Sequence, residues 1–261
     1  MLGHQWRVPS STIENYVKQI YLLQEMPRDG SLVAMGDLAA AMRVVPGTAT
    51  SMVKTLVDAG LVDYEPHVGV RLNERGANLA LHVLRRHRLI ELFLVRTLGM
   101  DWSEIHEEAE RLEHVISERV LQRIDTLLGH PTFDPHGDCI PDGAGAMPRR
   151  ALVSLSMAEA GKRVTVGRIA DQADAFLHFV DQNELRPGRE LEIIQRDEQA
   201  GIIRARLDND REVSLGLGAA AKIEVEVRAA RAVRPAANDR ERRTKVPPDQ
   251  THATQATTYR G

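Results

Sequence analysis

Histidine and carboxylate side chains are concentrated between positions 101 and 118. This stretch holds seven acidic residues and two histidines against a single arginine. If it is helical, at about 100° per residue, four of these side chains share one face about 100° wide: His106, Glu110, Glu113 and His114. Imidazole nitrogens and carboxylate oxygens gathered on one face are suitable ligands for first-row divalent metal ions. The spacing therefore predicts a metal site on this helix.

The preceding helix carries a second pair of potential ligands. His87 and Glu91 are four residues apart, so they lie on the same side of a helix. Ligands that converge from two helices would complete a site for a divalent ion. The alternative is an acidic surface that faces solvent, and this is our interpretation of three further glutamates: Glu107, Glu108 and Glu118.

Two classes of metalloenzyme do not fit this pattern. HEEAE at 106–110 lacks the second histidine of the HExxH metalloprotease motif. A di-iron bundle needs two Glu-x-x-His pairs, and the stretch 101–118 contains neither. A metal-dependent hydrolase of another kind stays open as an alternative, although no nucleophile or general base stands apart from the ligands. We therefore expect a protein that is not an enzyme.

Long helices must position these ligands. The spacing of apolar residues predicts one helix over 77–98, interrupted by Gly99, and another over about 103–128. The segment 130–150 is rich in Pro, Gly and Asp, so we expect a loop or a connector between domains.

Three short helices and a hairpin are predicted upstream of these long helices. Helical spacing covers 12–25, 35–43 and 47–60, and apolar residues alternate with polar ones on both sides of a turn at 67–69. A helix-turn-helix followed directly by a hairpin is typical of a winged helix.

The winged helix is expected to bind duplex DNA with the start of its third helix. Residues 1–75 contain seven Lys/Arg and eight Asp/Glu, which argues against strong non-specific binding. We predict phosphate contacts from three basic residues: Arg43, Lys54 and Arg71. We predict base contacts from three short hydroxyl side chains: Thr48, Thr50 and Ser51. A winged helix that binds only proteins is the alternative.

Residues 151–227 change to a period of two. Five segments alternate in this way, which predicts a small five-strand β barrel or sandwich with one short helix at about 171–183. From position 228 the periodicity disappears, and eight Lys/Arg stand against three Asp/Glu. We expect the segment 228–261 to be a disordered tail. The fold class is therefore α+β.

Composition excludes several other classes. Of 261 residues, 43% are hydrophobic and 27% charged, as in globular proteins. No stretch approaches the roughly 20 apolar residues of a membrane span, so no membrane partner is expected. The N-terminus lacks the apolar segment of a secretory signal, and we expect a cytoplasmic protein. Cys139 is the single cysteine, which excludes an internal disulfide and a multi-cysteine zinc site.

Several motifs in this order resemble the diphtheria toxin repressor family of metal-dependent transcription regulators. They are RRHRLIELFL and IHEEAERLEHVISE on the two long helices and DPHGDCIP in the following loop. The resemblance covers about 8–227. It implies a winged helix at 8–75, a helical metal-binding and dimerisation domain at 76–150, and an SH3-like domain at 151–227, similar to the ferrous-transport accessory fold. It also implies a homodimer that binds a palindromic operator.

The same resemblance assigns a main regulatory site to Glu110, Glu113 and His114. The first of these positions is cysteine in iron-responsive members and glutamate in manganese transport regulators, and a carboxylate favours Mn²⁺ over softer ions. A fourth ligand aligns with Asn15, where manganese regulators usually have aspartate. Their further acidic ligand is Lys18 here, which argues against a close-spaced binuclear site.

Members with an SH3-like domain have a second metal site. His87, Glu91 and His106 match its helical ligands in the iron-responsive branch. In related manganese regulators the loop that aligns with Asp134 and His136 supplies ligands together with Glu91. A side chain of the β domain would complete the site, and the two candidates are Gln172 and Asp174. The sequence leaves open which of these sets binds metal.

The segment PGTATSMVKTL at 46–56 resembles the recognition helix of the manganese branch. This resemblance implies that Pro46 starts the DNA-binding helix. Together these features predict an Mn²⁺-dependent, DNA-binding repressor of metal-uptake genes, in which the ion links the first helix to the dimerisation helices. An Fe²⁺-dependent regulator of the same family is the alternative.

Overall fold

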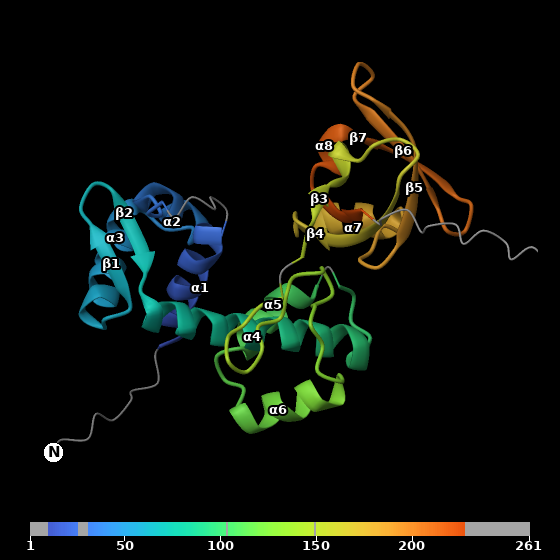
Figure 1. Cartoon of the computed structure of the whole chain (residues 1–261). Coiled ribbons are helices and arrows are strands. Elements are labelled where there is room, and N and C mark those ends of the chain that lie inside the picture. Colours follow the sequence, from blue (N-terminus) through green and yellow to red (C-terminus); the bar gives the residue numbers. More distant parts are fainter. Residues whose placement is uncertain (1–9, 26–30, 103, 149, 228–261) are drawn as a thin grey trace, which may run out of the picture. The chain divides into compact units, whose positions relative to one another are not determined.

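The computed structural model of the chain describes residues 10–25, 31–102, 104–148 and 150–227 (Figure 1). The predicted disordered tail, 228–261, lies outside the described residues. Within the described part, every helix is too short or too polar to span a lipid bilayer.

The first elements form the predicted winged helix. They are α1 (Ser11–Glu25), α2 (Met35–Ala41), α3 (Pro46–Asp58), β1 (Val62–Glu65) and β2 (Gly69–Leu72). The two strands pair antiparallel, and their apolar faces pack with the helices around one core. That core includes Val17, Ile20, Leu38, Val53, Leu56, Val62 and Val70. The predicted helices and hairpin are confirmed.

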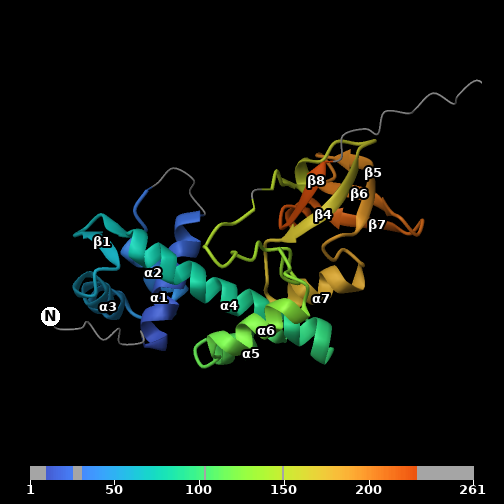
Figure 2. The ribbon, with the colours of Figure 1, turned by 60° about the horizontal axis from the view of Figure 1, so that its bottom comes forward.

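The longest helix, α4 (Glu74–Leu98), begins directly after the hairpin. Both α5 (Ile105–Leu112) and α6 (Glu118–Leu127) pack against it (Figures 1 and 2). Its start is three residues before the predicted one, because the Asn73 side chain accepts a hydrogen bond from Gly76 N and caps the first turn. Gly99, with φ of 68°, ends it as predicted.

The prediction of one continuous helix over 103–128 is wrong. The structure has two helices, α5 (Ile105–Leu112) and α6 (Glu118–Leu127), joined by a turn. The Ser117 side chain accepts a hydrogen bond from Val120 N, so it starts a new helix where apolar spacing alone suggested continuation. His114 therefore lies in a turn and not on a helical face.

The C-terminal domain is an SH3-like sheet with six strands instead of the predicted five. Its hydrogen-bonded order is β3-β8-β4-β5-β6-β7. The additional strand, β3, has two residues, too few to show an alternating pattern. The strands are β3 (Val153–Ser154), β4 (Arg163–Ile169), β5 (Glu190–Asp197), β6 (Ile202–Leu207), β7 (Glu212–Gly216) and β8 (Ile223–Val227). The short helices are η1 (Leu155–Met157), α7 (Asp174–Gln182) and α8 (Leu217–Ala220).

The helical region and the sheet share one hydrophobic core. Ile90 and Leu94 of α4, Ile105 of α5 and the intervening Trp102 are buried in the same cluster as the apolar side chains of the sheet. The C-terminal part of α4 and the adjoining α5 therefore pack against the C-terminal domain. This positions the side chains described next.

Candidate metal centre

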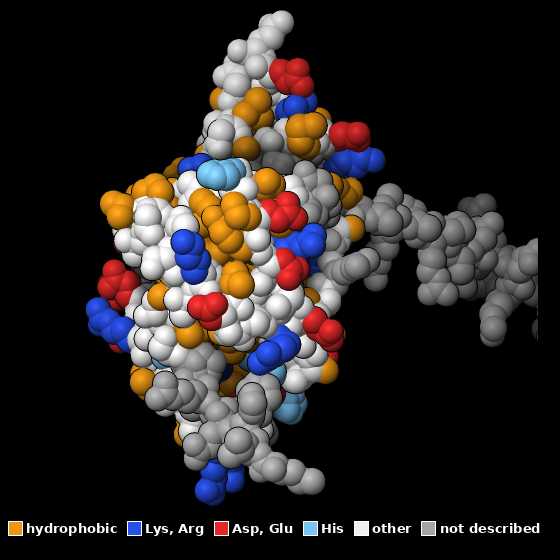
Figure 3. Space-filling model, turned by 90° about the vertical axis from the view of Figure 1, so that its left-hand side faces the viewer, with side chains coloured by type: hydrophobic (Ala, Val, Ile, Leu, Met, Phe, Trp, Pro, Cys, Tyr) orange, Lys and Arg blue, Asp and Glu red, His pale blue; other side chains and the backbone are white. Residues whose placement is uncertain are grey.

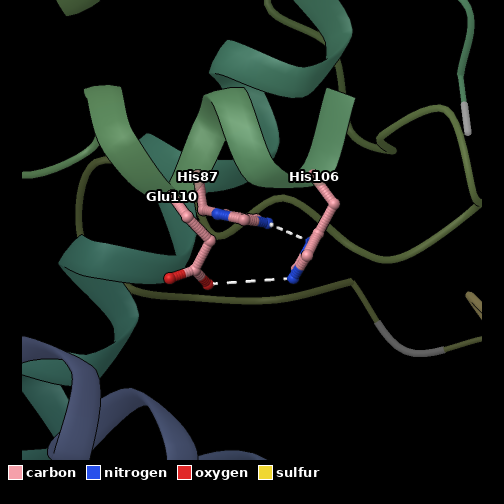
Figure 4. A group of neighbouring side chains, drawn as sticks. All are labelled: His87, His106 and Glu110. Carbon is pink, nitrogen blue, oxygen red and sulfur yellow. Dashed lines mark hydrogen bonds and ion pairs between the residues drawn. The ribbon is translucent and has the colours of Figure 1, made fainter. Parts of the chain in front are cut away.

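Four of the predicted ligands meet where α4 and α5 pack together. His87 and Glu91 come from α4, and His106 and Glu110 come from α5. The Nε2 atom of His87 lies 3.2 Å from Nδ1 of His106 and 3.0 Å from Oε1 of Glu91. Nε2 of His106 lies 3.8 Å from Oε1 of Glu110. Figure 4 shows three of them, His87, His106 and Glu110, arranged as a group that could hold a metal ion.

Glu91 is the residue that connects this group to the rest of the site. Its side chain is buried and contacts His87, His106 and His136. Burial alone would raise its pKa, but these imidazoles hold the pKa well below its usual range. A buried, ionised carboxylate surrounded by imidazoles is a strong ligand for a cation.

The neighbouring His87 is charged at neutral pH. Its burial favours the neutral form, but Glu91 and a hydrogen bond from Nδ1 to Glu113, 2.7 Å long, raise the pKa to about 9. Without a divalent ion, the imidazolium itself balances the buried carboxylates.

A second group of potential ligands consists of Glu91 with Asp134 and His136, and all three are buried. Asp134 Oδ1 accepts hydrogen bonds from the backbone N of His136 and of Asp138, at 2.8 and 2.9 Å, and so shapes the turn. This turn directs the His136 ring toward α4.

The two nitrogens of His136 have different surroundings. Nε2 lies 3.3 Å from the carbonyl oxygen of Trp102, which can only accept, so Nε2 carries the proton. Among the described residues Nδ1 finds no hydrogen-bond partner, although it is buried and lies 3.8 Å from Oε2 of Glu91. Burial lowers the pKa of His136, so the imidazole is neutral. A buried, unpartnered lone pair directed at a carboxylate fits a metal ligand.

Electrostatics around Asp134 favour a cation in the same place. Burial, together with the nearby carboxylates of Asp138 and Glu91, raises the pKa of Asp134 well above its usual value. Arg88 provides only partial compensation, since its Nε lies 3.7 Å from Oδ2 of Asp134. A divalent ion would relieve this repulsion, so the residues present fit a metal ion.

The C-terminal domain holds this loop in position. Ile169 N donates to the carbonyl oxygen of His136, and Arg168 and Gln172 donate to the two carboxylate oxygens of Asp138, at 2.6 and 2.8 Å. Of the two predicted β-domain ligands, Gln172 thus contacts the loop by its hydrogen bond to Asp138. Asp174 is exposed at the start of α7 and belongs to neither potential ligand group within the described residues.

The remaining predicted ligands lie beside an ammonium and side chains of α1. Lys18 Nζ, from α1, lies 2.6 Å from Oε1 of Glu110 and 2.7 Å from Oε1 of Glu113. Beside it, His114 contacts two residues of α1: Nδ1 is 2.6 Å from Oε2 of Glu14, and Nε2 is 2.8 Å from Oδ1 of Asn15. The predicted set of Glu110, Glu113, His114 and Asn15 is thus engaged in contacts within the chain.

Sequence reasoning missed the part that Glu14 plays. It is buried and bonds both to His114 and to Arg86, whose Nη2 lies 3.0 Å from Oε1 of Glu14. One signal was available. Glu14, Asn15 and Lys18 lie on one side of a single helical turn, next to the buried Val17. Polar side chains on a packed face need hydrogen-bond or ion-pair partners.

The predicted DNA contacts lie on and around α3. Pro46 occupies the first turn of this helix, as expected. Most of the other predicted residues are exposed there and on the hairpin: Arg43, Thr48, Ser51, Lys54 and Arg71. Thr50 is half-buried and donates a hydrogen bond to the carbonyl oxygen of Pro46.

The charges on this side of the molecule are mixed. On the face shown in Figure 3, which includes the winged helix, basic and acidic side chains are interspersed. Arg71, for example, pairs with Asp63 across the hairpin at 3.3 Å. This distribution agrees with the balanced charge of the sequence, and any DNA binding must depend on shape and specific contacts as well as on charge.

Three family models match consecutive parts of the chain. Residues 10–70 match the model described as iron dependent repressor, N-terminal DNA binding domain. Residues 73–142 match the iron dependent repressor, metal binding and dimerisation domain, and residues 153–227 match the FeoA domain.

Individual proteins agree with these matches. The iron-dependent repressor IdeR of Mycobacterium tuberculosis is 35% identical over 162 residues, which are 59% of this chain and 69% of that protein. The transcriptional regulator MntR of Lysinibacillus sphaericus is 33% identical over 121 residues, 46% of this chain and 84% of that protein. A solved manganese-dependent transcriptional repressor in complex with manganese superposes with a TM-score of 0.74 at 37% identity. The superposition covers 82% of this chain and 99% of that one. All three are described as repressors or regulators of transcription, which agrees with the expectation that the chain is not an enzyme.

Proposed function

Because this chain belongs to the iron-dependent repressor family, and is therefore a metal-dependent repressor of transcription, we propose that its effector is Mn²⁺ and that it represses metal-uptake genes. We further propose that it acts in the cytoplasm, as a homodimer bound to a palindromic operator. Fe²⁺ is the alternative effector. The observation that carries the metal dependence is the buried, unpartnered Nδ1 of His136 facing Glu91.

The chemistry of the donors supports Mn²⁺. The two ligand groups contain imidazoles and carboxylates without a thiolate. Cys139 lies outside both groups, and burial raises the pKa of its thiol. Carboxylate-rich sites suit Mn²⁺, whereas thiolates favour softer ions. The name of the manganese-bound repressor that superposes on this chain points the same way.

We assign the metal to the region around Glu91. His87, Glu91, His106 and Glu110 would hold it from the two helices, and Asp134 and His136 would hold it from the loop. A bound divalent ion would supply the positive charge that these buried carboxylates lack. This assignment rests on the two ligand groups and on the orphaned imidazole nitrogen.

The chain itself connects this region to the DNA-binding elements. Glu110 of α5 pairs with Lys18 of α1, and α1 contributes Val17 and Ile20 to the core of the winged helix. Ligands that fix α5 against α4 therefore also restrict the orientation of the winged helix. By this route, metal binding would raise the population of the DNA-competent arrangement.

We propose that the start of α3 enters the major groove. Thr48, Thr50 and Ser51 would face base edges, and three basic residues would contact phosphates: Arg43, Lys54 and Arg71. Support comes from the exposure of most of these side chains and from the DNA-binding family model over 10–70.

The proposed homodimer would form through the helical region. Val115 beside α5 and Val120 and Leu127 on α6 are exposed aliphatic side chains, 76%, 49% and 65% accessible. Aliphatic surface of this kind commonly marks an interface. The matching model for 73–142 is described as a dimerisation domain.

The family models also support the proposed division of the chain. The winged helix would occupy 8–75, the metal-binding and dimerisation domain 76–150, and the SH3-like domain 151–227. The matched ranges, 10–70, 73–142 and 153–227, fall close to these bounds.

We expect Mn²⁺ binding to release protons. His87, whose pKa Glu91 and Glu113 raise to about 9 against the effect of burial, must lose a proton before its nitrogen can bind an ion. The pKa of Asp134 is raised as well, chiefly by burial. Because the metal-free protein holds more protons, Mn²⁺ affinity should rise with pH from neutrality toward about 9, by up to about tenfold per unit for each proton released.

Calorimetric titration in buffers of different ionisation enthalpy counts these protons. An affinity that stays constant between about pH 6.5 and about pH 8.5 would contradict the proposed part of His87.

The proposed function is tested by selecting DNA from a random-sequence duplex library with the full chain under anaerobic conditions. We expect a palindromic motif to be enriched with Mn²⁺, less strongly with Fe²⁺, and not at all with a chelator. Stronger enrichment with Fe²⁺ would favour the alternative effector. Equal enrichment with and without metal would refute metal-dependent DNA binding.

A further inference from the structure

A buried ammonium occupies the place between two predicted metal ligands. Lys18 is 6% exposed, Glu113 is fully buried, and Nζ of Lys18 lies within 2.7 Å of a carboxylate oxygen of both Glu110 and Glu113. These contacts join α1 to α5 and its C-terminal end across more than 90 residues of sequence. A buried lysine needs such partners, because an unpaired charge in the interior is strongly unfavourable.

The carboxylate of Glu113 is fully used by the chain. Its Oε1 faces Lys18, at 2.7 Å, and His114, at 3.3 Å. Its Oε2 accepts a hydrogen bond from His87 at 2.7 Å. A divalent ion at the Lys18 position would have to bind the same oxygens, so it would have to displace the ammonium.

The same turn of α1 makes three more contacts with this region. Glu14 and Asn15 both bond to His114, and Glu14 also bonds to Arg86 of α4. Three polar side chains of α1, Glu14, Asn15 and Lys18, are thus paired without any ion. The first helix is held to the dimerisation helices by groups of the chain itself.

We propose that Lys18 is a specificity-determining residue that serves as a built-in cation: its ammonium joins α1 to α5 and keeps a further metal ion out of the space between the carboxylates of Glu110 and Glu113. The inference rests on the proposed function in one respect, namely that metal binds around Glu91. It differs from the mechanism expected from the sequence, in which an ion links the first helix to the scaffold. Here that link is permanent, and the ion acts on the neighbouring ligands of α4, α5 and the loop.

The number of ions bound per chain tests this exclusion. Lys18→Glu replaces the ammonium with a third carboxylate beside Glu110 and Glu113. We expect equilibrium dialysis of the full chain against Mn²⁺, followed by elemental analysis, to find one more ion per chain in Lys18→Glu than in the unmodified protein. Lys162→Glu is the matched control, because Lys162 is exposed and its Nζ lies 3.9 Å from the carboxylate of Glu159, which is also exposed. Equal numbers in all three proteins would overturn the proposal.

A second variant tests the link itself and does not depend on the additional site. Lys18→Met keeps most of the aliphatic side chain and removes the charge. In metal-free protein we expect amide hydrogen exchange in α1 to accelerate by about tenfold, while α3 and the sheet are unaffected. Unchanged exchange in α1 would show that Lys18 does not hold this helix.

These results can be separated from a failure of the proposed function, because neither measurement contains DNA. Suppose that metal did not alter DNA binding, but Lys18→Glu bound an additional ion and Lys18→Met accelerated hydrogen exchange in α1. Only the proposed function would then be refuted. If metal controlled DNA binding, but both variants matched the unmodified protein in bound ions and in hydrogen exchange, only the role assigned to Lys18 would be refuted.

Discussion

Replacing Glu91 with glutamine should weaken Mn²⁺ binding by about 100-fold or more, the largest effect that we expect from a single side chain. Glu91 contacts His87, His106 and His136, so it connects the two potential ligand groups. Glutamine preserves the volume but removes the negative charge from a buried position. Calorimetric titration of the metal-free chain with Mn²⁺ measures the loss.

The control for this experiment is Glu107→Gln. Glu107 is an exposed residue of α5 whose carboxylate lies 3.6 Å from Arg111, away from both ligand groups. We expect its Mn²⁺ affinity to match that of the unmodified protein. An equally small change in Glu91→Gln would contradict the assignment of the metal to this region.

The second large effect is expected from Gly137→Ala, in the loop that carries Asp134 and His136. Gly137 has φ of +87°, and a Cβ atom there would lie 2.1 Å from the carbonyl oxygen of Gly167 in β4. The loop must therefore move away from the sheet, which should lower the free energy of unfolding by about 2–4 kcal/mol. Because His136 moves with the loop, Mn²⁺ affinity should fall as well.

Gly129→Ala separates these two causes. Gly129 also has a positive φ, +76°, but nothing lies within 4 Å of the position of its Cβ. The backbone strain alone should cost about 1 kcal/mol in the free energy of unfolding and leave Mn²⁺ affinity unchanged. Denaturant unfolding and Mn²⁺ titration of both variants test this. Equal losses in the two variants would show that the close approach to Gly167 is not required.

The winged helix was predictable because the sequence signals that specify it are local. Apolar spacing, the turn at His67 and the proline at the start of α3 each act over a few residues. The positions of His87 and Glu91, four residues apart on α4, followed from the same geometry. The meeting of α4 with α5 at His106 was anticipated from residue type, because these ligands have a common chemistry.

The break between α5 and α6 was not predictable from apolar spacing. Val115 and Ile116 continue the apolar pattern through the turn, and the one local signal was Ser117, which caps α6. The consequence is chemical. His114 leaves the helical face and meets Asn15 and Glu14 instead of the ligands on α5.

The contacts of Lys18 and Asp138 depend on pairs that are far apart in the sequence. A lysine on an amphipathic helix is normally exposed, and its burial here results from carboxylates more than 90 residues away. The loop at 134–138 is also held in place by Arg168 and Gln172, which belong to another domain. Periodicity carries no information about such pairs.

The most direct test of the account is the affinity of the full chain for its selected duplex with Mn²⁺ and with a chelator, at constant ionic strength. If ligands around Glu91 control the winged helix, Mn²⁺ should tighten DNA binding by about 10- to 100-fold, and the duplex should tighten Mn²⁺ binding by the same factor. In Glu91→Gln the difference should disappear. Equal affinity for the duplex in both conditions would contradict the account.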